Sequence, residues 1–346
     1  MPEVLADHTT LRLGGPAARW VRATTEEELV AAVSEADAAG EPVLVLGGGS
    51  NLVVADEGFA GTVVEVATRG VTPDVEDGVA CGGVLVAVAA GEGWDDLVAL
   101  AVSKEWAGIE ALSGIPGSVG ATPIQNVGAY GQEVSQTIAS VRVWDRTLRG
   151  VRTFASADCG FGYRTSRFKA DRRDAFGGRH VVLSVTFQLQ QGSLGAPVAY
   201  AELARALGVE LGERAPLASV REAVLALRGG KGMVLDAADH DTWSAGSFFT
   251  NPVLPSDAVP AGAPAWPQPD GTVKTSAAWL IEHAGFTKGH GNDRVALSGK
   301  HTLALTNRGG ATTADLMALA RDVRDGVEAR FGVRLVNEPV LVGCSL

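Results

Sequence analysis

The sequence predicts an α+β protein with more than one domain. Strand-like and helix-like segments alternate near the start of the chain, short β-type runs dominate residues 62–187, and helices recur in the last third. Strands and helices that are segregated in this way are typical of α+β folds. With 346 residues, of which 46% are hydrophobic and 20% charged, the chain can bury two or three ordinary domain cores. The composition therefore predicts a soluble globular protein.

The first elements form a small predicted α/β unit. Thr25 and Glu28 have the spacing of a capping box, apolar side chains at residues 29–36 share one helical face, and Gly40 ends the helix. A buried strand is expected at residues 43–46. The sequence Gly-Gly-Gly-Ser-Asn follows at residues 47–51, and we call it the GGGSN turn.

The GGGSN turn has two interpretations. It lacks the third glycine of the dinucleotide-binding pattern G-x-G-x-x-G, and no helix opens after it. It is therefore either a tight turn between two strands or a loop whose backbone grips a pyrophosphate.

The middle of the chain continues the α+β pattern. One helix is expected at residues 94–106, and two more at residues 199–207 and 219–227. Strands are expected at residues 62–66, 84–88, 140–144 and 181–187.

The final third, from about residue 228, has the composition of a separate lobe. It contains an aspartate-rich polar loop at residues 236–241, a proline-rich connector at residues 252–269 and two helices. The last helix, at residues 314–330, starts with Asp315 and carries Arg324 and Arg330 in its second half. These charges complement the helix dipole.

Residues 111–132 form an uncharged, glycine-rich stretch. Its 22 residues include five glycines and two prolines, which a membrane-spanning helix of this length would avoid. Glycine backbone offers N–H donors and lets a bound molecule approach closely. The stretch is either a cradle for a ligand or irregular buried packing.

Charge and cysteine content exclude several classes of function. A net charge of −11 disfavours nonspecific binding to nucleic acid. Cys81, Cys159 and Cys344 lack metal-ligand spacing and are odd in number, so we expect buried structural thiols and no metal site. Residues 1–7 lack the features of a secretory signal, and the apolar run at residues 79–91 is too short to cross a membrane. The cytoplasm is the expected compartment.

Three motifs place single polar side chains beside small or apolar neighbours: FGYR at residues 161–164, SAGSFFTNP at residues 244–252 and NEP at residues 337–339. Such neighbours limit water while they present one functional atom. A serine nucleophile would require G-x-S-x-G and a histidine base. Ser247 lies in A-G-S-F-F instead, which makes a hydrolase a poor fit.

Five motifs resemble the UDP-N-acetylenolpyruvoylglucosamine reductase family in order and over essentially the whole chain. They are GIEALSGIPGSVGATPIQNVGAYGQE, CGFGYRTSRFK, SAGSFFTNP, AAWLIEHAGFTKG and VNEPVLVG. The resemblance implies an FAD-binding two-lobe fold of the vanillyl-alcohol-oxidase/PCMH type plus a C-terminal α+β substrate domain. It places two FAD-binding subdomains at residues 1–66 and 67–225 and the substrate domain at residues 226–346, with the option that the final strand packs back on the FAD domains.

The same resemblance implies an activity. It is an FAD-dependent reduction of UDP-N-acetylglucosamine enolpyruvate to UDP-N-acetylmuramate by NADPH, in peptidoglycan precursor synthesis. No nucleic acid or membrane partner is implied, and a monomer is expected. Two alternatives remain: a flavin oxidase of the same fold that acts on an alcohol, and a non-catalytic module that binds nucleotide sugars.

The motifs assign catalytic roles to three residues. Ser247 resembles the family's proton donor, Arg164 its catalytic arginine and Glu338 its catalytic glutamate. Considered without the resemblance, these residues are a turn hydroxyl, a surface ion-pair arginine and a solvated acid at a strand end. The resemblance further implies that substrate is bound by Tyr163, Tyr200, Lys231, Asn251 and His283.

The FAD is expected between the GGGSN turn and the glycine-rich stretch, with main chain on its pyrophosphate. The expected contacts are Gly47, Gly48, Gly49, Ser50, Asn51, Gly114, Ile115, Pro116, Gly117, Ser118, Gly120, Asn126, Gly128 and Ala129.

Overall fold

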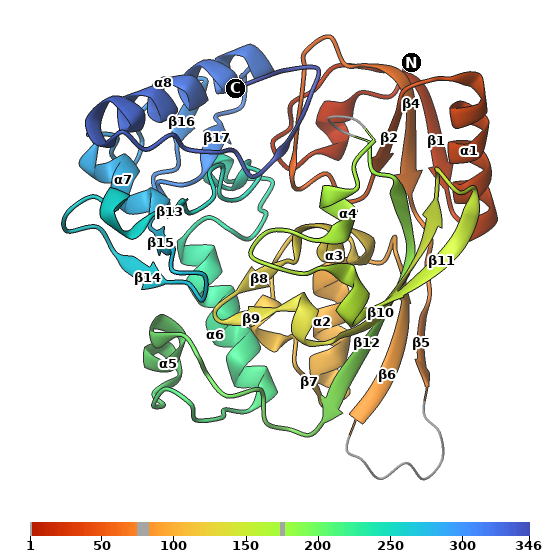
Figure 1. Cartoon of the computed structure of the whole chain (residues 1–346), viewed down its shortest axis with the longest axis horizontal. Helices are drawn as coiled ribbons and strands as arrows, with labels where there is room; N and C mark the ends of the chain where they lie inside the picture. Colours follow the sequence, from red (N-terminus) through yellow and green to blue (C-terminus); the bar gives the residue numbers. More distant parts are fainter. Residues whose placement is uncertain (1, 75–82, 174–176) are drawn as a thin grey trace. The chain divides into compact units, whose positions relative to one another are not determined.

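The computed structural model describes residues 2–74, 83–173 and 177–346 and divides the chain into two compact units. Unit 1 consists of residues 1–16, 49–59 and 231–346, and unit 2 of residues 17–48 and 60–230. The course of the chain can be followed by colour in Figure 1. The three predicted domains, with boundaries at residues 66 and 225, stay a prediction, because these units are defined by compactness alone.

Unit 2 begins with a three-stranded sheet in the order β1-β4-β2. Its strands are β1 (Ala17–Ala23), β2 (Val43–Leu46) and β4 (Phe59–Val66), and helix α1 (Glu26–Ala39) packs against it. The predicted capping box of Thr25 and Glu28 is confirmed, and so is the left-handed Gly40 that ends α1. Strand β2 is buried, as expected from its apolar sequence.

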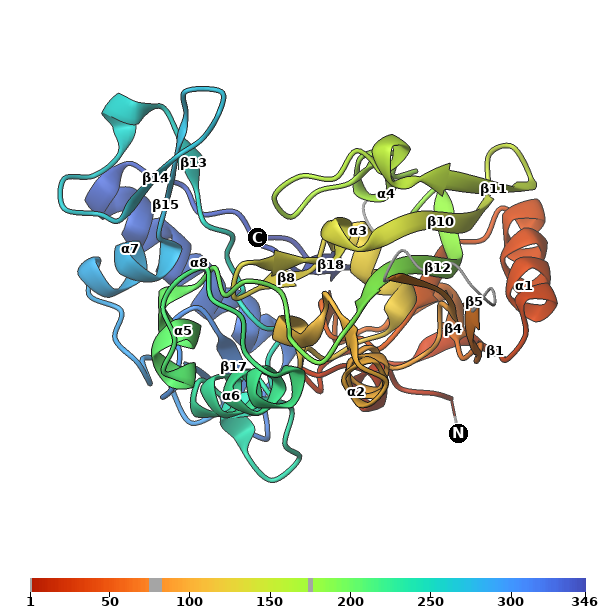
Figure 2. The same cartoon turned by 90° about the horizontal axis from the view of Figure 1, so that it is seen from below.

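A six-stranded antiparallel sheet forms the centre of unit 2, in the order β11-β10-β12-β6-β5, with β7 beside β12. Its strands are β5 (Val71–Asp74), β6 (Gly83–Ala89), β7 (Trp106–Ala107), β10 (Ile138–Asp145), β11 (Gly150–Ala155) and β12 (His180–Gln191). Side chains of β6 alternate between exposed and buried, and the buried ones join the same core as α2 (Trp94–Ser103). Figure 2 shows these strands and α2 in a second view.

The prediction of a helix at residues 94–106 was wrong at its C-terminal end. It stops at Ser103, Glu105 adopts a positive φ of 58°, and Trp106 pairs with Gln191 in the sheet. A right-handed helix needs a negative φ at every residue, so it cannot continue through Glu105. Tertiary pairing therefore overrode the helical spacing of the apolar side chains.

The rest of unit 2 consists of short elements and two helices. These are η2 (Glu110–Leu112), η3 (Val119–Ala121), α3 (Thr122–Gln125), β8 (Gly128–Ala129), β9 (Gln132–Glu133), η4 (Val134–Gln136), η5 (Ser156–Cys159), α4 (Arg167–Ala170), α5 (Ala201–Leu207) and α6 (Leu217–Gly230). The two helices expected near α5 and α6 are confirmed, although α6 is longer than predicted. Most of the glycine-rich stretch therefore lies in turns and single helical turns.

Unit 1 surrounds a second core. Its elements are η1 (Leu5–His8), β3 (Leu52–Val54), η6 (His240–Thr242), β13 (Val253–Leu254), η7 (Ser256–Ala258), β14 (Ala265–Pro267), β15 (Val273–Thr275), α7 (Ala277–His283), β16 (Val295–Leu297), β17 (Leu305–Asn307), α8 (Thr313–Phe331) and β18 (Val340–Val342). The final strand β18 runs parallel to β3. The connector predicted at residues 252–269 was wrong in part, because it contributes β13 and β14 to a three-stranded sheet with β15.

Helix α8 is the longest helix of unit 1, and its ends follow the predicted signals. Thr312 and Asp315 form a capping box, and Gly332 closes the helix in the left-handed conformation. The predicted acidic start is therefore confirmed. Arg324 is buried and bonds to Asp325.

None of the helices in the described part of the chain is long and apolar enough to cross a membrane.

The thiols of Cys159 and Cys344 are free. Burial raises the pKa of Cys159 to about 11 and also raises the pKa of Cys344. High pKa values keep both thiols protonated and unreactive at neutral pH. The prediction for Cys81 concerns a residue outside the described ranges.

Asp145 at the end of β10 anchors a buried ion pair with Arg179. Its carboxylate accepts two hydrogen bonds from the Arg179 guanidinium, at 2.9 and 2.8 Å, and two more from the N–H groups of Thr147 and Leu148. Burial opposes ionisation of Asp145, but the hydrogen bonds outweigh it and lower the pKa from 3.8 to about 2. The charged form of this residue therefore stabilises the folded chain.

We predict that Asp145→Asn lowers the free energy of unfolding at neutral pH by roughly 2 kcal/mol, as expected for hydrogen bonds to a charged group. A depressed folded pKa stabilises above the unfolded pKa of about 4, and this stabilisation is lost as the pH falls towards 2. Urea unfolding at neutral pH and near pH 2 measures both effects, with the exposed Asp257→Asn as the control. Equal stability of Asp145→Asn and the unsubstituted chain at neutral pH would contradict this prediction.

Candidate active site

The end of strand β2 packs directly on the glycine-rich stretch within unit 2. A Cβ atom on Gly47 would lie 2.4 Å from the Ser118 Oγ, and one on Gly48 would lie 2.6 Å from the Gly117 Cα. Both distances are too short for any side chain. The Gly47 backbone therefore packs against the Ser118 side chain and the Gly48 backbone against that of Gly117, so the two segments lie side by side at the predicted cofactor residues.

Gly117 to Gly120 lie beside the segment that leads from β6 into α2. The N–H of Trp94 donates to the Gly117 carbonyl at 3.0 Å, and the N–H of Gly120 donates to Ala90 at 2.8 Å. A Cβ on Gly120 would lie 2.5 Å from that of Ala90. Ile115 and Pro116 are half-buried at the start of this segment. These contacts fix the position of the predicted cofactor residues.

Gly114 is held by a carboxylate. Its N–H donates to Asp95 at 2.6 Å, and Asp95 also receives two hydrogen bonds from Arg221, at 2.7 and 2.8 Å. Burial raises the pKa of Asp95, whereas the bonds from Arg221 and Gly114 lower it, with a net decrease. Because its N–H already has an acceptor, any contact of Gly114 with a cofactor would come from its Cα or its carbonyl group.

The Asn126 side chain is committed to the protein itself. Its amide nitrogen donates to Glu133 and to the Gly162 carbonyl, both at 2.9 Å, and its oxygen accepts from the Ser135 N–H at 3.2 Å. Any contact of Asn126 with a cofactor would therefore come from its backbone. The adjacent Gln125 has a buried amide nitrogen without a hydrogen-bond partner among the described residues.

Gln125 was not among the predicted site residues. A buried donor without a partner is rare in native proteins, and a ligand or an ordered water would satisfy this one. The only signal in the sequence is that this amide side chain stands within an otherwise small and apolar stretch. Glycine backbone and a buried amide are the kinds of group that bind a pyrophosphate and a flat, polar heterocycle.

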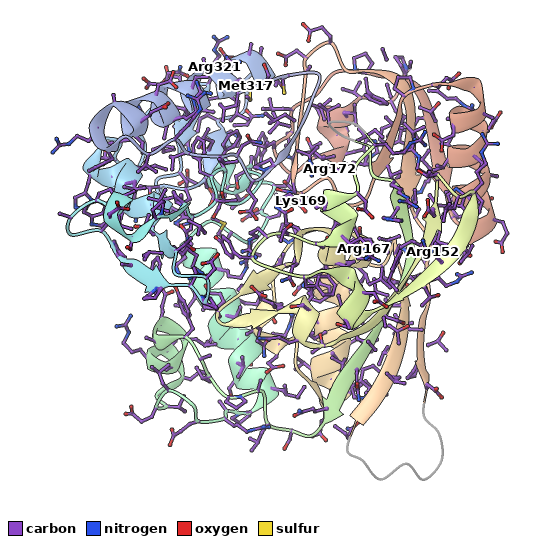
Figure 3. The ribbon with its side chains drawn as sticks, viewed as in Figure 1. Arg152, Arg167, Lys169, Arg172, Met317 and Arg321 are labelled. Carbon is purple, nitrogen blue, oxygen red and sulfur yellow. The ribbon has the colours of Figure 1, made fainter. Side chains whose placement is uncertain are left out.

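Arg164 connects the FGYR motif to the glycine-rich stretch. Its guanidinium donates to the carbonyl groups of Gly128 at 3.0 Å and Asn126 at 3.4 Å. The Arg164 backbone has a positive φ of 52°, which is unusual for a non-glycine residue and is often found at functional sites. Lys169 donates to the Arg164 carbonyl at 2.9 Å. Figure 3 shows Lys169 on α4 with Arg167 close to it.

The tyrosines predicted to bind substrate lie in unit 2. The Tyr163 ring is next to the Arg164 guanidinium, 5.6 Å from its carbon to the ring centroid. Tyr200, which is 46% exposed, precedes α5 and meets the Tyr130 ring edge-on at 5.6 Å between centroids. Ala129 lies in the short β8, next to Tyr130. An exposed tyrosine held at one edge has its hydroxyl group available for a ligand.

In unit 1, Ser247 and Glu338 lie on neighbouring segments. The Phe248 N–H donates to Leu303 at 2.7 Å, and the Phe248 carbonyl accepts from the Glu338 N–H at 2.8 Å. Phe248 and Phe249 are fully buried, and their rings pack edge to face at 5.1 Å. The backbone of Ser247 is therefore held in place by the buried aromatic pair that follows it. The same aromatic segment pairs with the NEP motif, which contains Glu338.

Asn251 also has a structural bond. Its oxygen accepts from the Ala277 N–H at 3.0 Å at the start of α7, while its amide nitrogen has no partner among the described residues.

The second half of the GGGSN turn, which consists of Gly49, Ser50 and Asn51, belongs to unit 1. Gly49 has a φ of 60° and contacts the His8 carbonyl so closely that a Cβ would lie 1.9 Å away. The Asn51 carbonyl accepts from the Val340 N–H at 2.9 Å.

Lys231 and His283 complete the predicted substrate residues. Lys231 starts the part of unit 1 that follows α6 and precedes the left-handed Gly232, whose φ is 66°. His283 is the last residue of α7, where its Nδ1 lies 2.8 Å from the Trp279 carbonyl and its ring stacks on Trp279 at 3.8 Å. The His283 ring is therefore engaged with its own helix.

The predicted site residues divide between the two units. Unit 1 holds Ser247, Glu338, Asn251, Lys231 and His283, and unit 2 holds Arg164, Tyr163 and Tyr200 with most of the predicted cofactor contacts.

Two family descriptions match parts of the chain. Residues 17–150 match an FAD binding domain, and residues 238–342 match the C-terminal domain of UDP-N-acetylenolpyruvoylglucosamine reductase. The first match includes the end of β2 and the glycine-rich stretch, and the second includes Ser247 and Glu338.

Individual proteins are similar over nearly the full length. A UDP-N-acetylenolpyruvoylglucosamine reductase of Cutibacterium acnes is 59% identical over 345 residues, with 99% of this chain and 90% of that protein covered. The reductase of Thermobifida fusca is 57% identical, with 99% and 97% covered. The crystal structure of UDP-N-acetylenolpyruvylglucosamine reductase from Thermus caldophilus matches with a TM-score of 0.67 at 25% identity, covering 99% of this chain and 98% of that one.

Proposed function

Because the chain belongs to the UDP-N-acetylenolpyruvoylglucosamine reductase family, we propose that its own residues carry out the reduction of UDP-N-acetylglucosamine enolpyruvate to UDP-N-acetylmuramate. The protein is an oxidoreductase that binds FAD and uses NADPH as reductant. The reaction supplies a precursor of peptidoglycan.

The cofactor cradle consists of Gly47 and Gly48 on one side and Gly117 and Ser118 on the other. Gly47, Gly48 and Gly117 present backbone without side chains, and Gln125 supplies a buried amide donor nearby in sequence. These residues would hold FAD, which would supply the hydride chemistry between NADPH and the terminal vinyl carbon of the substrate. The glycines let the two segments approach each other closely enough to form one binding surface.

Ser247 is the proposed proton donor. Hydride addition to a vinyl carbon leaves negative charge on the adjacent carbon and its carboxylate, and the Ser247 hydroxyl gives its proton to that carbon. A hydroxyl is a weak acid, so the transfer requires a strongly basic partner or a relay of donors. The observation that carries the proposal is the hydrogen bond between the Glu338 N–H and the Phe248 carbonyl, at 2.8 Å, which supports a shared role for Ser247 and Glu338.

Arg164 is proposed to stabilise the charge on the substrate carboxylate, and Glu338 to bind the same group through a shared proton, because two ionised carboxylates would repel each other. The guanidinium does so through charge-assisted hydrogen bonds, which are stronger than neutral ones. Lys231 is proposed to bind the diphosphate, and Tyr200 to close over it. Tyr163, Asn251 and His283 are proposed to contact the substrate as well.

NADPH and the sugar nucleotide are proposed to react in turn, with NADP⁺ leaving before the second substrate is reduced. This order predicts ping-pong kinetics. We further propose that the protein works as a monomer in the cytoplasm. Sedimentation velocity tests the first of these two statements, and a dimer at micromolar concentration would contradict it.

The proposed function predicts that NADPH bleaches the FAD-loaded protein under anaerobic conditions. The measurement is the absorbance of oxidised flavin during a titration with NADPH, with NADH as the comparison. No loss of absorbance would contradict the proposal. Hydrogen peroxide release with an alcohol substrate, and no reaction with the enolpyruvyl ether, would favour an oxidase instead.

A further inference from the structure

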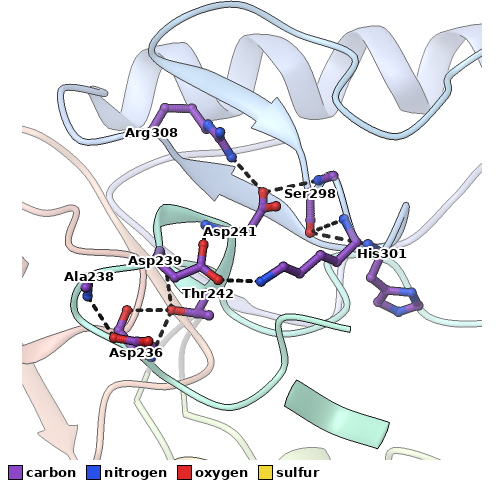
Figure 4. Close-up of polar contacts among 10 residues, drawn as sticks. Asp236, Ala238, Asp239, Asp241, Thr242, Ser298, His301 and Arg308 are labelled. Carbon is purple, nitrogen blue, oxygen red and sulfur yellow. Dashed lines mark hydrogen bonds and ion pairs between the residues drawn. The ribbon is translucent and has the colours of Figure 1, made fainter. Parts of the chain in front are cut away.

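The segment between Lys231 and Ser247 joins the proposed diphosphate-binding lysine to the proposed proton donor. Its regular structure is limited to the single turn η6 (His240–Thr242). A loop without regular hydrogen bonding moves unless other contacts fix it. Residues 236–242, which we call the aspartate loop, supply such contacts (Figure 4).

The aspartate loop is closed on itself by Thr242. The Thr242 hydroxyl lies 2.8 Å from the Asp236 carbonyl and 2.7 Å from the Asp239 carbonyl, and it accepts from the Asp236 N–H at 3.0 Å. The Asp241 N–H donates to the Asp239 carboxylate at 3.0 Å. The Asp236 carboxylate also stays within the loop, where it accepts from the Ala238 N–H at 2.9 Å, so the loop is a compact unit that contacts other segments through the carboxylates of Asp239 and Asp241.

The carboxylates of Asp239 and Asp241 bind residues 298–304, which we call the brace turn. Asp241 accepts from the Gly299 N–H at 3.1 Å and from Arg308, which follows the turn, at 2.6 Å. Asp239 forms an ion pair with Lys300. The hydrogen bond from Lys300 to Asp239 within this ion pair is the main cause of the lowered pKa of Asp239 and of the raised pKa of Lys300. Opposite charges thus hold the aspartate loop on the brace turn.

The brace turn is itself rigid. Ser298 is fully buried, and its hydroxyl oxygen accepts from the N–H groups of Lys300 at 3.0 Å and His301 at 3.2 Å. The Ser298 N–H donates to the Ala304 carbonyl at 2.8 Å. A turn closed by its own buried side chain is a firm base for the segments that bind to it.

The residues next to Lys231 and Ser247, at the two ends of the segment, both contact the aspartate loop or the brace turn. At one end, a Cβ on Gly232, the residue after Lys231, would lie 3.0 Å from the Asp241 carbonyl oxygen and 3.4 Å from the Lys300 Cδ. At the other end, the N–H of Phe248, the residue after Ser247, donates to Leu303 of the brace turn at 2.7 Å. The backbone of Gly232, the residue next to Lys231, is therefore packed against Asp241, which binds the aspartate loop to the brace turn.

We propose that Asp241 is a positioning residue for the sugar-nucleotide substrate, which acts by fixing Lys231 where it meets the diphosphate. This inference rests on the proposed function of Lys231. A lysine ammonium is a point charge on a flexible stem, so its attraction for phosphate depends on where its backbone is held. A displaced ammonium loses part of its attraction for the diphosphate, because the Coulomb attraction falls with distance.

The test is Asp241→Asn, which removes the charge attracting Arg308 and keeps the size of the side chain. We expect the KM for the enolpyruvyl sugar nucleotide and the dissociation constant of UDP to rise about tenfold, equivalent to about one weakened ionic contact. We expect kcat and the rate of flavin reduction by NADPH to stay within about twofold. The control Asp257→Asn, at an exposed aspartate in η7, should leave all four quantities unchanged.

A double-mutant cycle separates positioning from general loss of structure. In a Lys231→Ala background, Asp241→Asn should no longer weaken UDP binding, because the group that it positions is absent. Arg308→Gln breaks the same pair from the other side and should reproduce the tenfold rise, and Arg308→Lys, which keeps a cation, should recover most of the affinity. These two variants also replace Asp241→Asn if that protein fails to fold.

Two different results would overturn the inference. If Lys231→Ala leaves the dissociation constant of UDP unchanged, the proposed role of Lys231 is wrong and the inference falls with it. If Lys231→Ala weakens UDP binding but Asp241→Asn and Arg308→Gln do not, or if the effects of Lys231→Ala and Asp241→Asn simply add, the inference alone is wrong and the proposed function stands.

Discussion

Replacing Ser247 with alanine is expected to lower turnover of the enolpyruvyl sugar nucleotide by about 10³-fold, within the usual range for loss of a general acid. The flavin should still be reduced by NADPH at the normal rate, because hydride transfer to the flavin does not use the Ser247 proton. The neighbouring Phe248 keeps both of its backbone hydrogen bonds, to Leu303 and from Glu338. The substitution therefore removes a proton and leaves the backbone in place.

Anaerobic stopped-flow absorbance measures the two half-reactions separately. Ser256→Ala, an exposed serine of η7, is the matched control and should behave like the unsubstituted protein. Normal reoxidation of the reduced Ser247→Ala protein by the enolpyruvyl ether would show that another group donates the proton.

Replacing Gly48 with alanine is expected to weaken FAD binding by about 100-fold, since overpacking of this kind costs about 1–3 kcal/mol and each 1.4 kcal/mol is tenfold. The added methyl group would lie 2.6 Å from the Gly117 Cα and 3.0 Å from the Gly117 carbonyl carbon. Both are backbone atoms, so no flexible side chain can move aside. The two halves of the cradle must separate.

The ratio of bound flavin to protein and the FAD dissociation constant, measured by quenching of flavin fluorescence, test this prediction. Gly192→Ala is the matched control, because a Cβ at Gly192 meets no atom within 4 Å. Circular dichroism establishes that both variants fold. A folded Gly48→Ala protein with unchanged FAD affinity would contradict the assignment of the cradle.

Local signals in the sequence predicted local structure well. The capping box of Thr25 and Glu28 and the glycine that ends α1 were confirmed because their geometry depends on residues only a few positions apart. The strand at β2 and the acidic start of α8 were confirmed for the same reason. The end of α2 was not, because Trp106 is drawn into the sheet by Gln191, which lies far along the chain.

Long-range pairing could not be predicted. The sequence shows a conspicuous serine and a conspicuous glutamate, but nothing local shows that Phe248 bonds to the N–H of Glu338. Strand register depends on which faces are buried in the folded core. The three strands β13, β14 and β15 were missed because they are short and the segment is rich in proline, which favours a connector.

The candidate site was predicted in its chemistry more than in its contacts. Composition alone left the glycine-rich stretch open between a ligand cradle and buried packing, and the cofactor residues were given by the family resemblance and stay a prediction. Gln125 was missed since its significance depends on burial without a partner. The aspartate loop was predicted to be polar, but its function as a support for Lys231 requires knowledge of Lys300 and Arg308.

The most direct test of the account is one anaerobic turnover in two steps. The FAD-loaded protein is first reduced with one equivalent of NADPH, NADP⁺ is removed, and the enolpyruvyl sugar nucleotide is added. The account predicts that the absorbance of oxidised flavin returns in full and that one lactyl ether forms per flavin. Flavin that stays reduced in the presence of the enolpyruvyl ether would contradict it.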